Sequence, residues 1–444
     1  MDDKTLHFRS LSEPLPGPKW RALFDAHWSA YEAWYLAEGE RERPGYLACL
    51  NALRRHMPEL LPTYRTLCDL AGGGDLAARF LSLYQPPPYI TGCSQAVLAR
   101  PGDTLLARNY DYPPELCEGT ILHTRWNERR VIAMTDCLWG VLDGMNDRGL
   151  AVSLAFGGRK AVGDGFGAPI ILRYLLEFCD TVPEAAEVLA RVPTHMAYNI
   201  TLADAAGRYV TAMIGPDRRA SIRRVPVATN HQKKIEWYAH ALASETLIRE
   251  RQLSILVDDE ATDAARLEAA FKAPPLFRHD YRRGLGTIYT AFYRPGEGRV
   301  PPDQFIPLAE ETGLILPIGG WVLDTACRRL QDWAGHPHTQ RLHLSINVSA
   351  RQFHQPRFID LLLEALDRFE IPPGRLILEL TESVVLNDLS QTEQRMLAVR
   401  DLGIGLALDD FGTGFSSLSY LKHLPFDTLK IDRSFVSDMI ATAS

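Results

Sequence analysis

The stretch Ile90-Thr91-Gly92-Cys93-Ser94 opens a pair of predicted strands around which the rest of the chain can be arranged. Residues 94–100 and 104–110 have the composition of strands, and the Pro-Gly-Asp sequence between them is typical of a turn. Folding this hairpin at its turn brings Asp111, at the end of the second strand, next to Cys93, at the start of the first.

This arrangement points to an N-terminal nucleophile. A thiol attacks well only when a base takes its proton. Cleavage of the Gly92–Cys93 bond would give Cys93 an α-amino group, and such amines titrate near neutrality and serve as that base. Gly92, which has no Cβ, permits close approach of the backbone there. The alternative is a buried structural cysteine at the start of a strand.

Composition narrows the class of protein. The 444 residues predict two or three domains, and 46% apolar and 23% charged residues are typical of soluble globular proteins. A net charge of −7 argues against a binder of nucleic-acid polymers or of anionic membranes. The seven cysteines form no CxxC pair, which argues against a zinc or disulfide scaffold and favours a reducing compartment. Without a signal-peptide pattern or a run of ~18 apolar residues, we expect a cytoplasmic protein.

The order of predicted elements over the first 300 residues indicates a layered α+β domain. Residues 1–84 read as helical, and the turn cluster 143–149 separates two strands. The other predicted strands are 94–100, 104–110, 119–126, 130–138, 149–156, 196–203, 208–213, 220–228 and 286–293, and the predicted helices are 168–180, 183–191, 233–256 and 262–272. Runs of strands followed by pairs of helices predict two antiparallel sheets covered by helices.

Two polar residues in this part have both a chemical and a structural interpretation. Asn199 lies in an otherwise apolar strand, where its amide would donate to an oxyanion or be satisfied by the backbone. His231 ends a strand, where it would act as a proton shuttle or cap a loop.

Six motifs in this part resemble peptidase family C45. They are Thr91–Ser94, Arg108–Asp111, Gly144–Leu150, Tyr198–Asp204, Thr229–His231 and Thr287–Pro295. This autoproteolytic group includes acyl-CoA:6-aminopenicillanic acid acyltransferase and is related to the choloylglycine hydrolases. The resemblance covers about 20–300 and implies an Ntn-hydrolase αββα sandwich, cleaved between Gly92 and Cys93 into segments 1–92 and 93–300.

The resemblance also implies the roles of individual residues. Cys93 would be the nucleophile, Asp111 would position it or assist self-processing, and Asn199 would help to hold the oxyanion. A late arginine is also implied, with Arg282, Arg283 and Arg294 as open candidates. The substrate would be a small-molecule amide or thioester, handled without a cofactor.

From residue 301 the predicted elements alternate as in a parallel α/β fold. The predicted strands are 342–348, 375–381, 404–410 and 427–431, and the helices are a region reaching about 334, then 356–369, 390–401 and 416–422. Polar residues follow at the carboxyl ends of these strands: Asn347, Glu379, Asp409, Asp410 and Lys430. Amide and carboxylate oxygens suit Mg²⁺ or Mn²⁺, and a metal pair would suit phosphodiester hydrolysis. The alternative is a set of helix caps and solvated strand ends.

Four motifs of this second part resemble the EAL domain, the cyclic-di-GMP phosphodiesterase family: Ile346–Ser349, Glu379–Glu382, Asp409–Gly414 and Lys430–Asp432. The resemblance implies that Asn347, Glu379 and Asp409 are metal ligands, with Asp410 as a further ligand. It also implies that Lys430 contacts the nucleophilic water or the phosphate, and that cyclic-di-GMP is a ligand.

The departures from the EAL pattern predict a truncated domain over 301–444. The position of the signature Glu-Ala-Leu falls near Thr287, where the sequence continues the first family's pattern. The sequence ends at Ser444, and a barrel needs ~250 residues, so we expect four strands of eight, an incomplete (TIM-barrel-type) α/β fragment, and no phosphodiesterase activity.

Three hypotheses remain open from the sequence. The first is an Ntn acyltransferase or amidohydrolase with a degenerate EAL tail. The second is a cyclic-di-GMP phosphodiesterase or binding protein with the front half as an accessory. The third is a nonfunctional chimera, because no long linker separates the two patterns near residue 300.

Overall fold

The computed structural model describes residues 6, 8–296, 302–381, 384, 389–411 and 424–431. The chain separates into two compact units, Met1–Gly298 and Arg299–Ser444, and each is described by itself.

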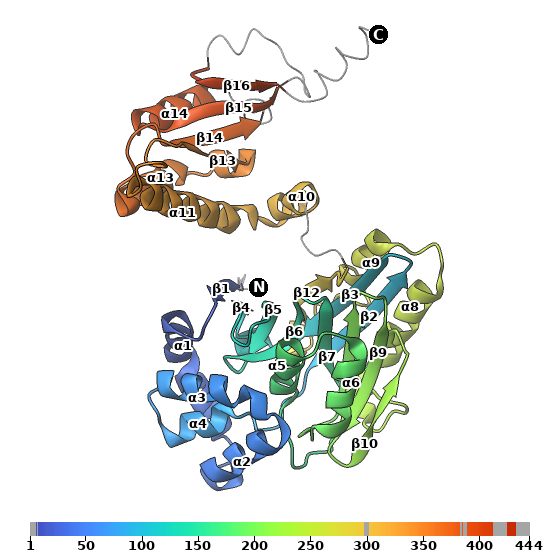
Figure 1. The fold of residues 1–444 in the computed structure, drawn as a ribbon. Coiled ribbons are helices and arrows are strands. Elements are labelled where there is room, and N and C mark those ends of the chain that lie inside the picture. Colours follow the sequence, from blue (N-terminus) through green and yellow to red (C-terminus); the bar gives the residue numbers. More distant parts are fainter. Residues whose placement is uncertain are drawn as a thin grey trace. The chain divides into compact units, whose positions relative to one another are not determined.

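The first unit contains an eight-stranded sheet (Figure 1). Its strand order is β1 (Arg9–Glu13), β4 (Thr120–Thr124), β5 (Val131–Asp136), β6 (Gly140–Asn146), β7 (Leu150–Phe156), β8 (Tyr198–Asp204), β9 (Tyr209–Gly215) and β10 (Arg218–Arg223). β1 and β4 are parallel and the other neighbours are antiparallel.

A four-stranded antiparallel sheet lies against it, with the order β11 (Val227–Ala228), β2 (Gly92–Arg100), β3 (Asp103–Asp111) and β12 (Thr287–Tyr293). Val97 and Leu106 of this sheet pack with Ala151 and Ala203 of the larger one and are fully buried. The inward-facing side chains of β2 and β3 therefore form part of the core between the sheets.

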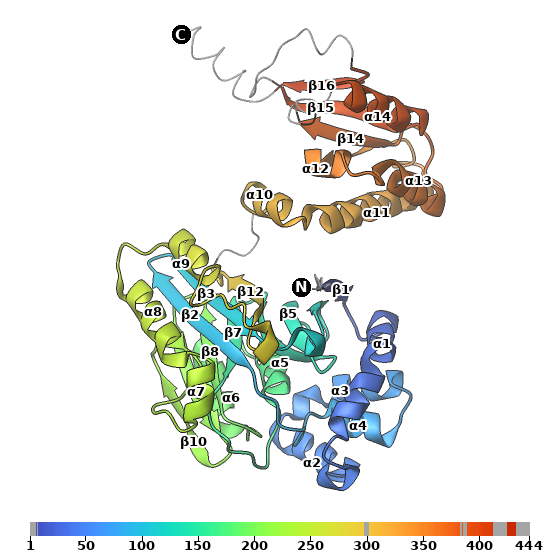
Figure 2. The same ribbon diagram turned by 180° about the vertical axis from the view of Figure 1, so that it is seen from behind.

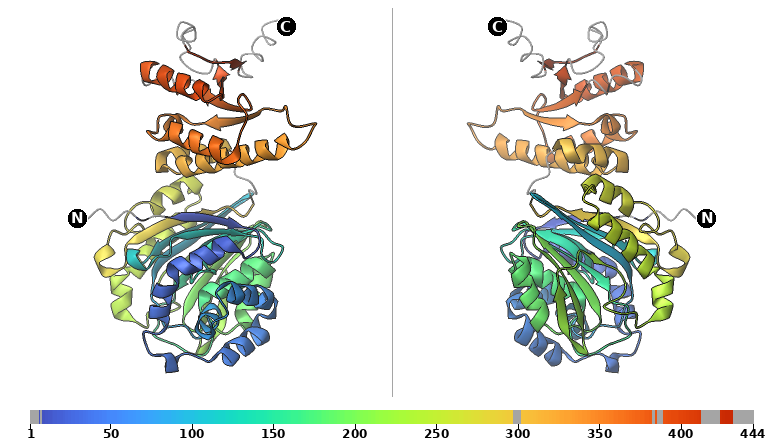
Figure 3. Two further views of the ribbon diagram at one scale, coloured as in Figure 1. Left: turned by 90° about the vertical axis from the view of Figure 1, so that its left-hand side faces the viewer. Right: turned by 90° about the vertical axis from the view of Figure 1, so that its right-hand side faces the viewer.

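Helices cover the outer faces of both sheets, so the first unit has the layer order helix, sheet, sheet, helix (Figure 3). α5 (Ala168–Phe178) and α6 (Val182–Arg191) pack on the larger sheet, and α8 (Thr246–Asp258) and α9 (Ala264–Phe271) on the smaller one. The remaining helices are α1 (Pro18–Tyr35), η1 (Glu40–Glu42), α2 (Tyr46–His56), η2 (Pro58–Leu60), α3 (Leu61–Leu70), α4 (Asp75–Leu81), η3 (Pro114–Leu116), α7 (Tyr238–Ala243) and η4 (Tyr281–Arg283).

The second unit has a parallel sheet in the order β13 (Leu344–Val348), β14 (Leu376–Thr381), β15 (Gly405–Phe411) and β16 (Thr428–Ile431) (Figure 2). Its helices are α10 (Pro302–Thr312), α11 (Ile315–Ala334), α12 (Ala350–Phe353), α13 (Phe358–Phe369) and α14 (Leu389–Asp401). The predicted strand–helix alternation is confirmed here, while the predicted helix 416–422 lies outside the described residues.

Four predictions of secondary structure were wrong. The predicted strand 220–228 is two strands, β10 and β11, which belong to different sheets. The predicted turn 143–149 is wrong over its first half, because residues 140–146 form β6, a strand that was not predicted, and the turn occupies only 147–149. The predicted helix 233–256 is two helices, with Glu245 between them in the left-handed region at φ 50°. The strand β1 lies in the segment predicted to be helical and is held by parallel pairing with β4, which local sequence does not reveal.

Among the described residues no single helix is long and apolar enough to cross a membrane. One pair, Phe305–Thr312 with Ile315–Ala334, meets the length and composition test together but is bent by 114°.

Candidate functional site

The predicted hairpin places Cys93 and Asp111 at one end of the small sheet. In the register of β2 and β3, Gly92 lies opposite Asp111 and Cys93 opposite Tyr110. Gly92 is packed tightly, since a Cβ added there would lie 3.1 Å from Asp111 Cβ and 3.2 Å from Leu285 Cδ2. The bond between Gly92 and Cys93 therefore lies beside the Asp111 side chain.

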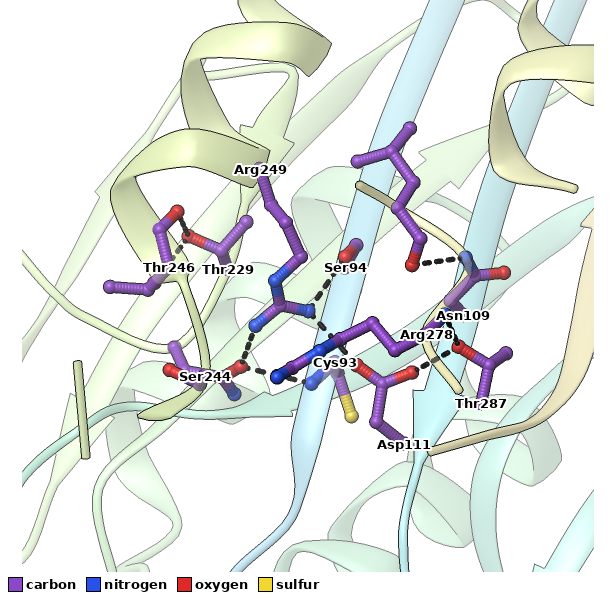
Figure 4. Close-up of polar contacts among 12 residues, drawn as sticks. Cys93, Ser94, Asn109, Asp111, Thr229, Ser244, Thr246, Arg249, Arg278 and Thr287 are labelled. Carbon is purple, nitrogen blue, oxygen red and sulfur yellow. Dashed lines mark hydrogen bonds and ion pairs between the residues drawn. The ribbon is translucent and has the colours of Figure 1, made fainter. Parts of the chain in front are cut away.

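Asp111 is fully buried and has two partners from distant parts of the chain (Figure 4). Arg249 Nη1 donates to one carboxylate oxygen at 3.0 Å, and Thr287 Oγ1 donates to the other at 2.7 Å. Burial raises the pKa of the Asp111 carboxyl, and the charge of Arg249 opposes that rise. The ion pair and the threonine hydroxyl thus fix the direction of the carboxylate.

Asn230, at the end of the segment after β11, contacts the backbone of the nucleophile. Its Oδ1 accepts the Cys93 N–H at 3.0 Å and Arg249 Nη2 at 2.6 Å. Its Nδ2 donates to the carbonyls of Thr91 and Phe156 at 3.3 and 3.2 Å. Asn230 therefore holds the amide nitrogen that cleavage would turn into an α-amino group.

Arg249 connects the parts of this cluster from the buried face of α8. Besides Asp111 and Asn230 it donates to Ser94 Oγ at 2.8 Å, and its side chain is fully buried. Neither Arg249 nor Asn230 is among the site residues predicted from the sequence. Arg249 could have been recognised as buried, because it lies on the same helical face as Leu253 and Leu256. Asn230 could have been recognised as the residue before His231 in the motif Thr229–His231.

A second arginine contacts the sulfur itself. Arg108 Nη2 lies 3.5 Å from Cys93 Sγ, and Thr91 Oγ1 lies 3.6 Å from the same atom. Arg108 Nη1 pairs with Asp143 of β6, and both side chains are fully buried. Arg108 therefore contacts the sulfur of Cys93, Arg249 contacts its neighbours Ser94 and Asn230, and each arginine has its own carboxylate partner.

The structure places Asn199 beside this cluster but engages its amide with the backbone. Asn199 Nδ2 donates to the carbonyls of Thr229 and His231, both at 2.8 Å, and its buried Oδ1 has no hydrogen-bond partner. Both amide hydrogens are therefore in use, so the predicted donation to an oxyanion would need a rearrangement. Asn199 in this state orients the segment that carries Asn230.

The other candidates of this unit lie apart from the sulfur. The His231 ring contacts Thr246 Oγ1 at 3.0 Å and Glu250 at 3.4 Å, both on α8. Arg282 and Arg283 are exposed in η4, and Arg294 pairs with Glu268 at 3.4 Å. Arg278, which is not among the predicted arginines, adjoins the cluster, because its backbone N–H donates to Thr287 Oγ1 at 2.9 Å. In Figure 4 the side chains of Arg249 and Arg278 approach the cluster from different sides.

In the second unit the predicted ligands lie at the carboxyl ends of neighbouring strands. Asn347 and Glu379 are directly opposite each other in the register of β13 and β14, and Asp409 lies opposite Thr381. Glu379 is buried and forms an ion pair with Lys430 of β16. Asp410 lies in β15, and its side chain is outside the described part.

These residues give only a partial fit to a metal site. Within the residues that the structure describes, no group of three or more His, Cys, Asp or Glu side chains is arranged to hold a metal ion. Glu379 is engaged by Lys430, and Asn347 is exposed. The metal ligands therefore stay a prediction.

Two family models match the chain. The model described as acyl-coenzyme A:6-aminopenicillanic acid acyl-transferase matches residues 98–301, and the EAL domain model matches residues 286–443. Both resemblances predicted from the motifs are confirmed by these matches.

Each of the similar proteins matches this chain over only a part of its own length. Signaling protein YkoW of Bacillus subtilis (strain 168) is 33% identical over 222 residues, which are 50% of this chain and 27% of that protein. The bifunctional diguanylate cyclase/cyclic di-GMP phosphodiesterase MucR of Pseudomonas aeruginosa is 44% identical over 145 residues, which are 33% of this chain and 21% of that protein. The chain thus spans about a quarter or less of these relatives.

A solved structure, PaMucR Phosphodiesterase in a c-di-GMP complex, is 45% identical, with a TM-score of 0.29; the match covers 31% of this chain and 58% of that chain. By the two family models, residues 98–301 of this chain are similar to the acyl-coenzyme A:6-aminopenicillanic acid acyl-transferase family and residues 286–443 to the EAL domain family.

Proposed function

We propose that the first unit is an autoproteolytic cysteine Ntn hydrolase or acyltransferase that acts on an amide or thioester acyl substrate. The observation that carries the proposal is the hydrogen bond from the Cys93 N–H to Asn230 Oδ1, in a buried network with Arg249 and Asp111. The layer order helix, sheet, sheet, helix and the match to the acyl-transferase family also support it. The fold would be an Ntn αββα sandwich.

Self-cleavage would begin at Cys93. Its sulfur attacks the Gly92 carbonyl carbon, the C–N bond breaks, and the amide nitrogen takes the thiol proton to become the α-amino group. Water then hydrolyses the thioester, which leaves a Gly92 carboxylate and a free Cys93 thiol. Asp111, fixed by Arg249 and Thr287, would hold the scissile bond in place from the strand opposite Gly92.

In the mature form the α-amino group of Cys93 would take the proton of the thiol. Asn230 Oδ1 would accept a hydrogen bond from this amino group. The thiolate attacks the acyl carbonyl of the substrate, and the leaving amine or thiol takes the proton as the bond to the acyl group breaks. The acyl-thioester then passes to water or to an acceptor amine, and the thiol is restored.

The intact mass of the purified full chain tests this proposal. We expect wild type to give two fragments that separate between Gly92 and Cys93, and Cys93→Ala to stay whole. Cys179→Ala, which removes a buried thiol at the end of α5, is the matched control and should cleave like wild type. An uncleaved wild type would contradict the proposal.

A second function is supported by the EAL match and by MucR, a relative named as a cyclic di-GMP phosphodiesterase. Here the second unit binds cyclic-di-GMP through the strand ends that carry Glu379 and Lys430, with Mg²⁺ or Mn²⁺ as the cation. Whether it also hydrolyses the nucleotide is open, because nothing in the comparisons supports the inactivity that we expected from the sequence.

Calorimetry with cyclic-di-GMP on the full chain, in metal-free and in Mn²⁺ buffer, tests this second function. We expect binding that Glu379→Gln weakens and Cys93→Ala leaves unchanged. Absence of binding in both buffers would contradict it.

A further inference from the structure

Asp143 has no role in the family resemblance, yet its carboxylate accepts hydrogen bonds from three side chains near the nucleophile. It lies in β6 between β5 and β7, and its side chain is fully buried. Three donors surround its carboxylate: Arg108 Nη1 and the hydroxyls of Tyr289 and Tyr293. A buried carboxylate with three donors of this kind is held in one orientation.

The two tyrosines stay protonated and can only strengthen this arrangement. Burial raises the pKa of both Tyr289 and Tyr293 well above the ordinary value, and the negative charge of Asp143 adds to the rise. Each hydroxyl therefore donates its hydrogen to Asp143. Tyr289 Oη also accepts a hydrogen bond from Arg108 Nη1 at 3.2 Å.

Arg108 is held by Asp143 and Tyr289 through one terminal nitrogen and contacts the Cys93 sulfur through the other. Its Nη1 faces Asp143 and its Nη2 lies 3.5 Å from Cys93 Sγ, while its guanidinium carbon lies 4.8 Å from the centre of the Tyr110 ring. A guanidinium is planar and rigid, so anchoring one terminal nitrogen sets the position of the other. A fixed positive charge beside a sulfur favours the thiolate that attacks a carbonyl.

We propose that Asp143, together with Tyr289 and Tyr293, is a positioning group for self-cleavage, and that it acts by holding Arg108 against Cys93 Sγ. The inference rests on the proposed Ntn function and goes beyond the residues that the family resemblance named. It also assigns β12 to the first unit's chemistry. This strand lies within residues 286–301, which both family models match, and supplies Thr287 to Asp111 and both tyrosines to Asp143.

The test is the rate of self-cleavage of freshly refolded full chain, followed by intact mass from pH 5 to pH 9. We expect Asp143→Asn to slow cleavage at pH 7 by about 10- to 100-fold and to displace the pH profile upward, because Arg108 loses its anchor. Tyr293→Phe should slow it less. Tyr174→Phe, which removes another buried hydroxyl bonded to a carboxylate (Glu59, 2.8 Å), is the matched control and should cleave at the wild-type rate.

A double-mutant cycle separates positioning from a general loss of structure. In an Arg108→Met background, Asp143→Asn should add little further loss, since its effect passes through Arg108. Losses that multiply independently would overturn the proposal, as would a wild-type rate and pH profile in both Asp143→Asn and Tyr293→Phe. If Asp143→Asn fails to fold, Tyr293→Phe and its control carry the test. An uncleaved wild type would instead contradict the Ntn function itself.

Discussion

The Cys93 cluster of the first unit and the strand-end residues of the second unit are built in different ways. Around Cys93, charged side chains from β3, β6 and α8 are fully buried and paired with one another. In the second unit, polar residues lie at neighbouring strand ends, and the ion pair between Glu379 and Lys430 is half open to solvent on the lysine side. A buried charge depends on its partner, whereas an exposed charge keeps water as a substitute.

The largest expected effect is on the buried pair. Arg249→Met leaves Asp111 buried without its cation, so we expect it to lower the free energy of unfolding of the first unit by about 3–5 kcal/mol and to stop self-cleavage. Urea unfolding followed by tryptophan fluorescence measures the first effect and intact mass the second. Arg266→Met, which breaks an exposed pair with Asp259, should change stability by less than about 1 kcal/mol. Equal losses in the two variants would contradict this contrast.

The next effect concerns close packing at the scissile bond. Gly92→Ala would place a Cβ 3.1 Å from Asp111 Cβ, so we expect it to cost about 1–3 kcal/mol and to slow self-cleavage. Gly45→Ala is the control, because no atom lies within 4 Å of a Cβ added there. Cleavage of Gly92→Ala at the wild-type rate would show that the tight packing at Gly92 has no part in the reaction.

A third prediction uses a buried carboxyl away from Cys93. Burial, with the nearby charge of Glu118, raises the pKa of Asp136 from 3.8 to about 7. Between pH 4 and pH 7 the folded chain therefore binds more protons than the unfolded chain, and the stability of the first unit should fall as pH rises, by up to roughly 4 kcal/mol. Asp136→Asn should flatten this slope in urea unfolding at pH 5 and pH 7, whereas Asp25→Asn, at an exposed pair, should keep it. If the stability of Asp136→Asn still falls as pH rises, groups other than Asp136 cause the pH dependence.

The smallest effect is expected at the second unit's ion pair. Lys430→Met should lower the free energy of unfolding of that unit by less than Arg249→Met lowers that of the first unit, because the lysine end of this pair is 42% exposed, although its partner Glu379 is buried. Hydrogen exchange of β14 and β15 amides measures this. A loss as large as that of Arg249→Met would remove the contrast between the two regions.

Much of the fold and part of the candidate site follow from local sequence. The hairpin from Cys93 to Asp111 is readable because β-favouring runs flank a Pro-Gly turn, and the α/β alternation after residue 301 because strand and helix periods differ. The missed strand β6 contains Asp143, Gly144 and Asn146, which resemble a turn in isolation. In the sheet, Asp143 has buried donors, and a Cβ at Gly144 would lie 2.7 Å from Ala133 Cβ.

The sequence by itself determined the two family resemblances, the nucleophile candidate and its hairpin partner, because these depend on residues that are close along the chain. Only the tertiary structure decided which distant side chains complete the cluster: Asn230 on the Cys93 amide, Arg249 on Asp111, and Asp143 behind Arg108. The physical reason is burial. From the local sequence an arginine or aspartate is predicted to be a solvated charge. Its role can be recognised only when the packed layers exclude water, so that another side chain must be its partner.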